Sequence, residues 1–170
     1  MTTSILKTKP QTRTGLNSLG SDQDRQQLGQ QVLRILSSTY VLMTKTQAVH
    51  WNVSGPLFKS VHDLTEDQYT DLFEAIDDLA ERIRALGLRA PMNYAAMQNG
   101  TDLEAFEGKP ISAGDMLRAL AADNELIASE LVQVIKAASE KGDPATEDLF
   151  TERLRIHQKN TWMLRAMIAE

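Results

Sequence analysis

The sequence predicts an all-α protein, a four-helix bundle with one long crossover connection. Beyond residue 21, proline occurs only at Pro56, Pro91, Pro110 and Pro144, so long stretches of chain are free of it. Apolar residues recur in these stretches at spacings of three and four, the period of an amphipathic helix, and no alternating pattern indicates a strand. Long amphipathic helices joined by short turns and one long connection are typical of such bundles.

The first half of the chain contains two predicted helices. The first covers residues 22–53, because Ser21-Asp22-Gln23-Asp24 is a capping-box pattern and the apolar residues after it keep a period near 3.6. The second covers residues 57–86, after the turn at Gly55-Pro56. Its apolar stripe ends at Gly87, which suits the C′ position of a helix.

The second half begins with the crossover, residues 88–111, which is long enough to pass from one end of a bundle to the other and to hold a short helix. A third helix is predicted over 113–141, after a second capping pattern at Ser112. The fourth starts at Asp143-Pro144, an N-cap followed by proline at N1, and fills most of the remainder. His157 lies on its apolar stripe, where we expect an interior histidine rather than a ligand.

The charge divides the chain into a basic tail, residues 1–21, and one bundle domain, residues 22–170. The tail carries Lys7, Lys9 and Arg13 and no acid, whereas the bundle has a net charge of −8. An acidic body repels DNA, so any contact with DNA would have to come from the three tail cations. The alternative is that these cations have no function.

Composition excludes several function classes. The chain has no cysteine, which rules out disulfides, thiolate metal sites and a catalytic thiol. It has no apolar run long enough to span a membrane, and the start, MTTSILKTKP, lacks the apolar segment of a signal peptide. We therefore expect a cytoplasmic protein.

The usual di-iron site inside a four-helix bundle is also excluded. Such sites carry Glu-x-x-His on two helices, but no histidine here has a glutamate three residues before it. The first predicted helix, moreover, has no acidic residue between Arg25 and Pro56. That helix cannot supply an inward-facing carboxylate.

The second predicted helix instead carries two pairs of possible ligands at i, i+4, His62 with Glu66 and Asp77 with Glu81. All four lie within an arc of about 100°, but the two pairs are ~22 Å apart along the axis, too far to share a metal. Either the pairs are unrelated solvated clusters, or they meet between subunits.

A twofold axis crossing this helix near residues 71–72 would place Asp77 and Glu81 of one chain against His62 and Glu66 of an antiparallel partner. His50 would add a nitrogen ligand if the turn after the first helix folds it back. Imidazole with carboxylates suits Fe(II), Zn(II) or Mn(II), and two irons sharing Glu81 would form a redox centre.

Two motifs give the chain a family resemblance. Ala48-Val49-His50-Trp51-Asn52-Val53-x-Gly55-x-x-Phe58-x-x-x-His62, followed by Asp77-x-x-Ala80-Glu81-Arg82, resembles the signature of the Dps family, the DNA-protecting mini-ferritins of starved bacteria. The resemblance extends to Trp162 near the C-terminus and is lost mainly in the tail. It implies a ferritin-like bundle, a hollow twelve-subunit shell, and ferroxidase sites with two irons each at twofold interfaces.

The resemblance also implies roles for single residues. His50, His62 and Glu66 would be ligands from one subunit, and Asp77 and Glu81 from its neighbour. The family more often has aspartate at the position of Glu66, so the longer side chain puts the second iron position in doubt. Trp51 is expected near the site, where it could quench an oxidising equivalent; the alternative is a packing aromatic at a subunit contact.

Further acids are candidates for handling iron outside the centre. Asp63 and Asp67 belong to a second acidic stripe on the same helix and would nucleate mineral if that stripe faces the cavity. Asp143, Asp148 and Glu152 resemble the lining of the family's threefold pore, where they would draw cations inward. The alternatives are a solvated helix face and ordinary helix capping.

Three function classes follow. The first is a stress-response ferroxidase that oxidises Fe(II), preferably with hydrogen peroxide, and stores the ferric product. The second is a DNA-compacting shell associated with the nucleoid. The third is a non-catalytic buffer for zinc or manganese. The ligand set favours the first.

Overall fold

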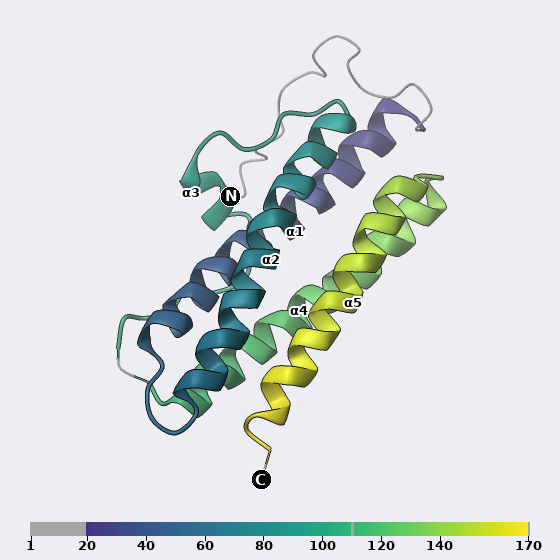
Figure 1. The fold of residues 1–170 in the computed structure, drawn as a ribbon. Coiled ribbons are helices and arrows are strands. Elements are labelled where there is room, and N and C mark those ends of the chain that lie inside the picture. Colours follow the sequence, from purple (N-terminus) through teal and green to yellow (C-terminus); the bar gives the residue numbers. More distant parts are fainter. Residues whose placement is uncertain (1–19, 110, 170) are drawn as a thin grey trace.

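The computed structural model describes residues 20–109 and 111–169, and that part of the chain consists of helices and loops without a strand (Figure 1). The predicted all-α fold is confirmed. Its helices are α1 (Asp22–Asn52), α2 (Phe58–Ala85), α3 (Tyr94–Gln98), α4 (Ala113–Glu140) and α5 (Pro144–Ala166).

The helix ends follow local chemistry that the sequence indicates. Ser21 caps α1 through the backbone N–H of Asp24, whose side chain accepts from the backbone N–H of Ser21, so the predicted capping box is present. At the end of α2, Gly87 has φ +85° and its N–H donates to the carbonyl of Arg84. The next N–H, of Leu88, reaches the carbonyl of Ile83 and completes a Schellman motif that turns the chain away from the helix.

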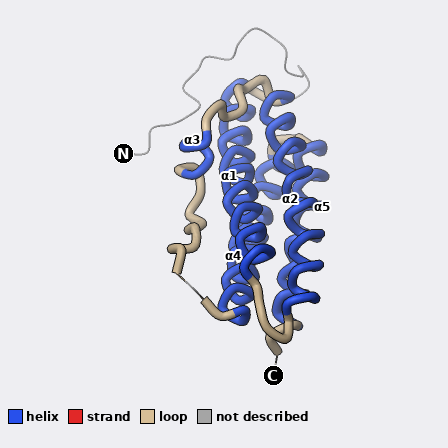
Figure 2. The backbone as a smooth tube through the Cα atoms, turned by 60° about the vertical axis from the view of Figure 1, so that its left-hand side comes forward, coloured by secondary structure: helices blue, strands red, loops and turns tan. Residues whose placement is uncertain are grey.

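The long helices pack as two hairpins. Helix α1 pairs with α2 and α4 with α5, and α1 also packs on α4, so the hairpins lie side by side (Figure 2). Their facing stripes form one apolar core that extends from Leu28 near the start of α1 to Leu164 near the end of α5. Gly29 permits the close approach of the crossover, because a Cβ built there would lie 2.1 Å from Cδ1 of Leu88.

The crossover runs from one end of the bundle to the other and contains the predicted short helix, α3 (Figure 1). Arg34 on α1 fixes it in place, donating to Asp102 of the crossover at 2.6 Å and to Glu130 of α4 at 2.7 Å. Ser38 and Thr101 share a hydrogen bond of 2.8 Å beside this ion pair. The long connection is therefore bound to the bundle and not a loose loop.

The start of α1 is anchored to the turn between α4 and α5. Lys141 donates to Asp24 at 2.8 Å and to Gln27 at 3.0 Å, and these bonds join the first turn of α1 to the last residue before Gly142. The predicted tail cations Lys7, Lys9 and Arg13 lie outside the described residues. Within the described ranges, no helix has the length and apolar character needed to cross a membrane.

Candidate metal centre

His50 and His62 hold each other in place. His50 lies in the last turn of α1 and His62 in the second turn of α2, and the turn at Gly55-Pro56 folds one against the other. Nδ1 of His50 donates to the main-chain carbonyl of His62 at 2.9 Å, and Nδ1 of His62 donates to that of His50 at 3.0 Å. The rings are stacked, with centroids 3.7 Å apart and planes 18° apart.

These two bonds set the tautomer of both rings. A carbonyl oxygen only accepts, so Nδ1 must carry the proton in each histidine. In a neutral ring Nε2 then keeps its lone pair, the form in which histidine binds metals, and a hydrogen bond from the other nitrogen is the usual support of such a ligand. Each histidine is thus prepared to bind a metal through Nε2 before any metal arrives.

Three residues to which the sequence pattern assigned no role contact or support the two histidines. The ring of Tyr69 meets His50 edge-on at 5.2 Å, and Phe58 packs beside His62 at 5.1 Å. The buried Thr65 hydroxyl donates to the carbonyls of Val61 and His62. The sequence signal for these residues is helical spacing, since Thr65 and Tyr69 follow His62 by three and seven positions on α2.

The three carboxylates of the predicted centre point to solvent. Glu66, Asp77 and Glu81 are all exposed, on the face of α2 turned away from the buried stripe of Leu72, Leu79 and neighbouring residues. Within the described residues of one chain, no group of three or more His, Asp or Glu side chains converges on a point that could hold a metal ion. A single chain brings together the two imidazoles and leaves the acids apart.

Two large aromatic side chains near this face are exposed. Phe73 is 67% exposed and lies on α2 within the arc of the four candidate ligands, just past the midpoint between them, which falls between residues 71 and 72. Trp51, directly after His50, is 70% exposed. One chain by itself thus leaves both aromatic rings exposed to solvent.

The sequence matches the family model of the ferritin-like domain over residues 30–170. A relative from Agrobacterium fabrum, named DNA protection during starvation protein, is 34% identical over 135 residues, which cover 79% of this chain and 83% of that protein. The chain belongs to the Dps family. Structures agree: Dps from Thermosynechococcus elongatus superposes with a TM-score of 0.84 at 30% identity, over 87% of this chain and 94% of that one.

A second Dps structure, from Vibrio cholerae, has a TM-score of 0.84 at 25% identity and covers 95% of this chain and 99% of its own. That protein is assigned to a broad superfamily of ferritin-like diiron-carboxylate proteins. The described helices of this Dps chain, α1 to α5, thus form the ferritin-like bundle that the resemblance implies.

Only some of the carboxylates near the second acidic stripe of α2 are free of ion pairs in this Dps chain. Asp67 is exposed and has no ion-pair partner among the described residues, whereas Asp63 is bound by Lys59, one turn before it on α2. Asp71, one turn after Asp67 on α2, accepts two hydrogen bonds from Arg153 of α5, at 3.1 and 2.8 Å. Of these three carboxylates, that of Asp67 is the most open to a cation.

The predicted pore residues differ in their surroundings. Asp148 and Glu152 are exposed on α5, and Glu152 pairs with Arg155. Asp143 is 1% exposed and is bound by Arg82 and Thr146, so it offers no free carboxylate to a passing cation. Asp143 thus differs in burial from the other two predicted pore residues, and a role in a pore stays a prediction for all three.

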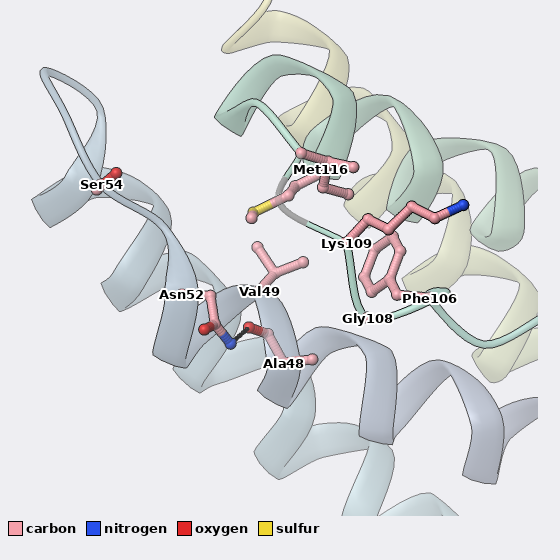
Figure 3. Close-up of a pocket in the computed structure, with 9 residues that line it drawn as sticks. Ala48, Val49, Asn52, Ser54, Phe106, Gly108, Lys109 and Met116 are labelled. Atoms are coloured by element: carbon pink, nitrogen blue, oxygen red, sulfur yellow. Dashed lines mark hydrogen bonds between the residues drawn. The ribbon is translucent and has the colours of Figure 1, made fainter.

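A cavity of about 510 Å³ lies between the end of α1, the crossover and the start of α4, lined by Val49, Phe106 and Met116 among others (Figure 3). It is not the metal centre. Ala48 and Asn52, which also line it, each point about 160° away from His50 on the helix.

Proposed function

We propose that this protein is a ferroxidase that oxidises Fe(II), preferably with hydrogen peroxide, and stores the ferric product in a hollow shell of twelve copies. The observation that carries the proposal is the mutual hydrogen bonding of His50 and His62, which leaves two Nε2 lone pairs for a metal. Membership of the Dps family supports the same assignment.

The centre would be completed by a second copy. The candidate ligands are symmetric about the point between residues 71 and 72, since His62 and Glu81 lie equally far from it, as do Glu66 and Asp77. An antiparallel partner helix crossing at that point would bring its acids to the histidines of the first chain. The acids of the first chain would likewise reach the histidines of the partner, which gives two equivalent centres. Phe73 would be covered at the middle of this interface.

The chemistry follows from pairing two irons. Hydrogen peroxide needs two electrons and two protons to become two molecules of water, and two Fe(II) ions supply both electrons. No hydroxyl radical is then released. Carboxylate and imidazole ligands suit Fe(II) as the substrate, although Zn(II) and Mn(II) accept the same ligands. Trp51, which directly follows His50 in the chain, would quench a stray oxidising equivalent.

Mixing two inactive variants tests the shared centre. One variant carries His50→Ala with His62→Ala, and the other carries Asp77→Asn with Glu81→Gln; co-expression under two affinity tags gives mixed shells. Each variant alone should not oxidise Fe(II) with peroxide. Mixed shells should recover about a quarter of wild-type oxidation, because half of the interfaces are mixed and each keeps one intact centre of two.

The same experiment separates the alternatives. Mixed shells without activity would contradict a centre shared between chains, and oxidation by either variant alone would contradict the assigned ligands. A wild-type shell that binds Fe(II) at this centre but never oxidises it would favour the metal buffer. Two further parts of the ferroxidase proposal concern acids outside the centre: nucleation at Asp63 and Asp67, and a pore lined by Asp143, Asp148 and Glu152.

DNA protection is a second candidate function, favoured by the name of the relative from Agrobacterium fabrum. We propose that Lys7, Lys9 and Arg13 bind the phosphate backbone and that twelve copies of the tail multiply a weak contact. A mobility shift of DNA at low salt should be lost when residues 1–15 are deleted. A shift that persists after the deletion would place DNA binding elsewhere on the shell.

A further inference from the structure

The two halves of the candidate metal centre differ in how the chain holds them. His50 and His62 are bound to each other through their Nδ1 atoms and main-chain carbonyls. Asp77 and Glu81 are exposed, and neither carboxylate has a hydrogen-bond or ion-pair partner among the described residues. Their positions in the proposed centre therefore depend on where the backbone of α2 places them.

Glu81 lies close to the end of α2. The helix ends at Ala85, so Glu81 is one turn from its last residue, and the ends of helices open more easily than their middles. The fully buried side chains of Leu79 and Ile83 hold this end against the core. Apolar contacts have no preferred direction, however, and do not by themselves fix the rotation of the helix about its axis. A directional contact near residue 81 would set where this carboxylate points.

Arg82 provides such a contact. Its Nη2 donates to both carboxylate oxygens of Asp143, at 2.7 and 2.6 Å, and its Nε donates to the hydroxyl of Thr146 at 2.7 Å. The side chains of Arg82 and Asp143 are 9% and 2% exposed, so water competes little for these bonds. The acceptors are themselves fixed, because Asp143 caps α5 and Thr146 lies in its first turn. Three bonds from one planar group thus bind α2 to α5 in one orientation.

We propose that Arg82 is a positioning residue for the acid half of the metal centre. Adjacent residues of an α-helix point about 100° apart, so the anchoring of Arg82 to α5 sets the direction of Glu81 on the exposed face of α2. In the proposed shell that face meets a second copy. Arg82 therefore acts on a centre whose imidazoles belong to another chain. This inference rests on the proposed ferroxidase function and its shared centre.

A second buried arginine between the same two helices offers a matched control. Arg153 on α5 is 7% exposed and donates to both carboxylate oxygens of Asp71 on α2, at 3.1 and 2.8 Å. Asp71 lies beside the midpoint between the candidate ligands, which falls between residues 71 and 72. Loss of this contact should therefore affect the histidine half and the acid half of the centre alike.

Mixed shells distinguish positioning from stabilisation of the fold. The acid donor is a chain with His50→Ala and His62→Ala, and the histidine donor is a chain with Asp77→Asn and Glu81→Gln. Each mixed interface then has one intact centre, with acids from the first chain and histidines from the second. Arg82→Lys, which keeps the charge and loses the planar set of donors, is added to one donor or to the other. Both kinds of shell contain equally many altered chains, so a loss of stability alone affects them equally.

Anaerobic calorimetry measures the affinity of the intact centres for Fe(II). Arg82→Lys in the acid donor should weaken this binding about tenfold, a usual cost of removing a contact that orients a ligand. The same change in the histidine donor should leave the affinity unchanged, and Arg153→Lys should give equal affinities in its two placements. Equal affinities for the two placements of Arg82→Lys would overturn the inference.

Thr146→Val provides the same test if Arg82→Lys prevents folding. It removes the acceptor of the Nε of Arg82 but keeps Asp143, and it should weaken Fe(II) binding only when it is in the acid donor. Thr146→Ser, which restores the hydroxyl, should recover the affinity. Equal affinities for the two placements of Thr146→Val would likewise contradict the positioning role. Mixed shells without any change at Arg82 or Thr146 that neither bind nor oxidise Fe(II) would instead overturn the proposed function, and the inference with it.

Discussion

Arg82 on α2 donates two hydrogen bonds to the carboxylate of Asp143, at 2.7 and 2.6 Å, and a third to the hydroxyl of Thr146. Asp143 in turn caps α5 by accepting from the backbone N–H of Thr146 at 3.1 Å. This ion pair joins the second helix of the first hairpin to the last helix of the second. Its two charged groups are almost fully buried.

Asp143→Asn should destabilise the fold by about 3–5 kcal/mol at neutral pH, because it leaves the buried guanidinium of Arg82 without a counter-charge. Urea unfolding measures the loss. The matched control is Asp115→Asn, which removes an exposed acid paired with Arg118 and should cost at most about 1 kcal/mol. Equal losses in the two variants would contradict the role given to burial.

The same variant should change the dependence of stability on pH. Burial disfavours the charged form of Asp143, but hydrogen bonds from Thr146 and Arg82 outweigh it and lower its pKa. The folded state therefore keeps this carboxyl ionised at a pH where the unfolded chain binds a proton. The ionised carboxyl of Asp143 therefore makes its full contribution to the free energy of unfolding above about pH 4, and this contribution is lost as the pH falls further. The stability difference between wild type and Asp143→Asn should narrow below pH 4.

The stability lost in Lys45→Met should also depend on pH. Burial raises the pKa of Asp123 even though Lys45 lies 2.5 Å from it, and without the lysine the carboxylate is buried unpaired. The loss should be about 3–5 kcal/mol at pH 8 and smaller near pH 4, where Asp123 takes up a proton. Adding Asp123→Asn to Lys45→Met should recover much of the stability at pH 8. A loss independent of pH would contradict the ion-pair interpretation.

His157 should contribute to acid unfolding. Burial and the nearby charge of Arg153 lower its pKa to about 3, and its Nδ1 is bound to Asn124 at 2.8 Å inside the bundle. The unfolded chain binds a proton at this position below about pH 6.5 and the folded chain does not. Stability should therefore fall from pH 6.5 toward pH 3, by up to about 1.4 kcal/mol per pH unit. His157→Gln should reduce this slope in thermal unfolding.

Glu66→Asp tests the departure from the more frequent family residue. The shorter side chain should place its carboxylate closer to His62 and strengthen binding of the second iron. Binding of the first iron should change little. Titration of assembled shells with Fe(II) under anaerobic conditions, followed by calorimetry, measures the two steps. An unchanged second step would show that the extra methylene of Glu66 does not limit that position.

The sequence was sufficient for the helices, because their signals are local. Caps at Ser21 and Ser112, the proline after Asp143 and the glycine at Gly87 each act within a few residues, and the predicted boundaries agree with the structure to within one residue. His157 was likewise predicted to lie in the interior from its position on an apolar stripe, and it is fully buried.

Contacts between distant segments could not be predicted in the same way. Arg82 and Asp143 are 61 positions apart, and nothing in the acidic start of α5 indicates which carboxylate the bundle will bury. The mutual bonds of His50 and His62 depend on how the turn at Gly55 directs two helices, which spacing alone does not show. The predicted sharing of ligands between subunits stays a prediction until the mixed shells are measured.

The ion pair between Asp24 and Lys141 has a practical consequence for engineering. Because it ties the first turn of α1 to the α4–α5 turn, the junction at Gly20 is a fixed attachment point on the folded domain. A fluorescent label or peptide fused there would start from one defined position on every copy. Replacing Lys141 would remove the ion pair that holds this attachment point and would leave the apolar core unchanged.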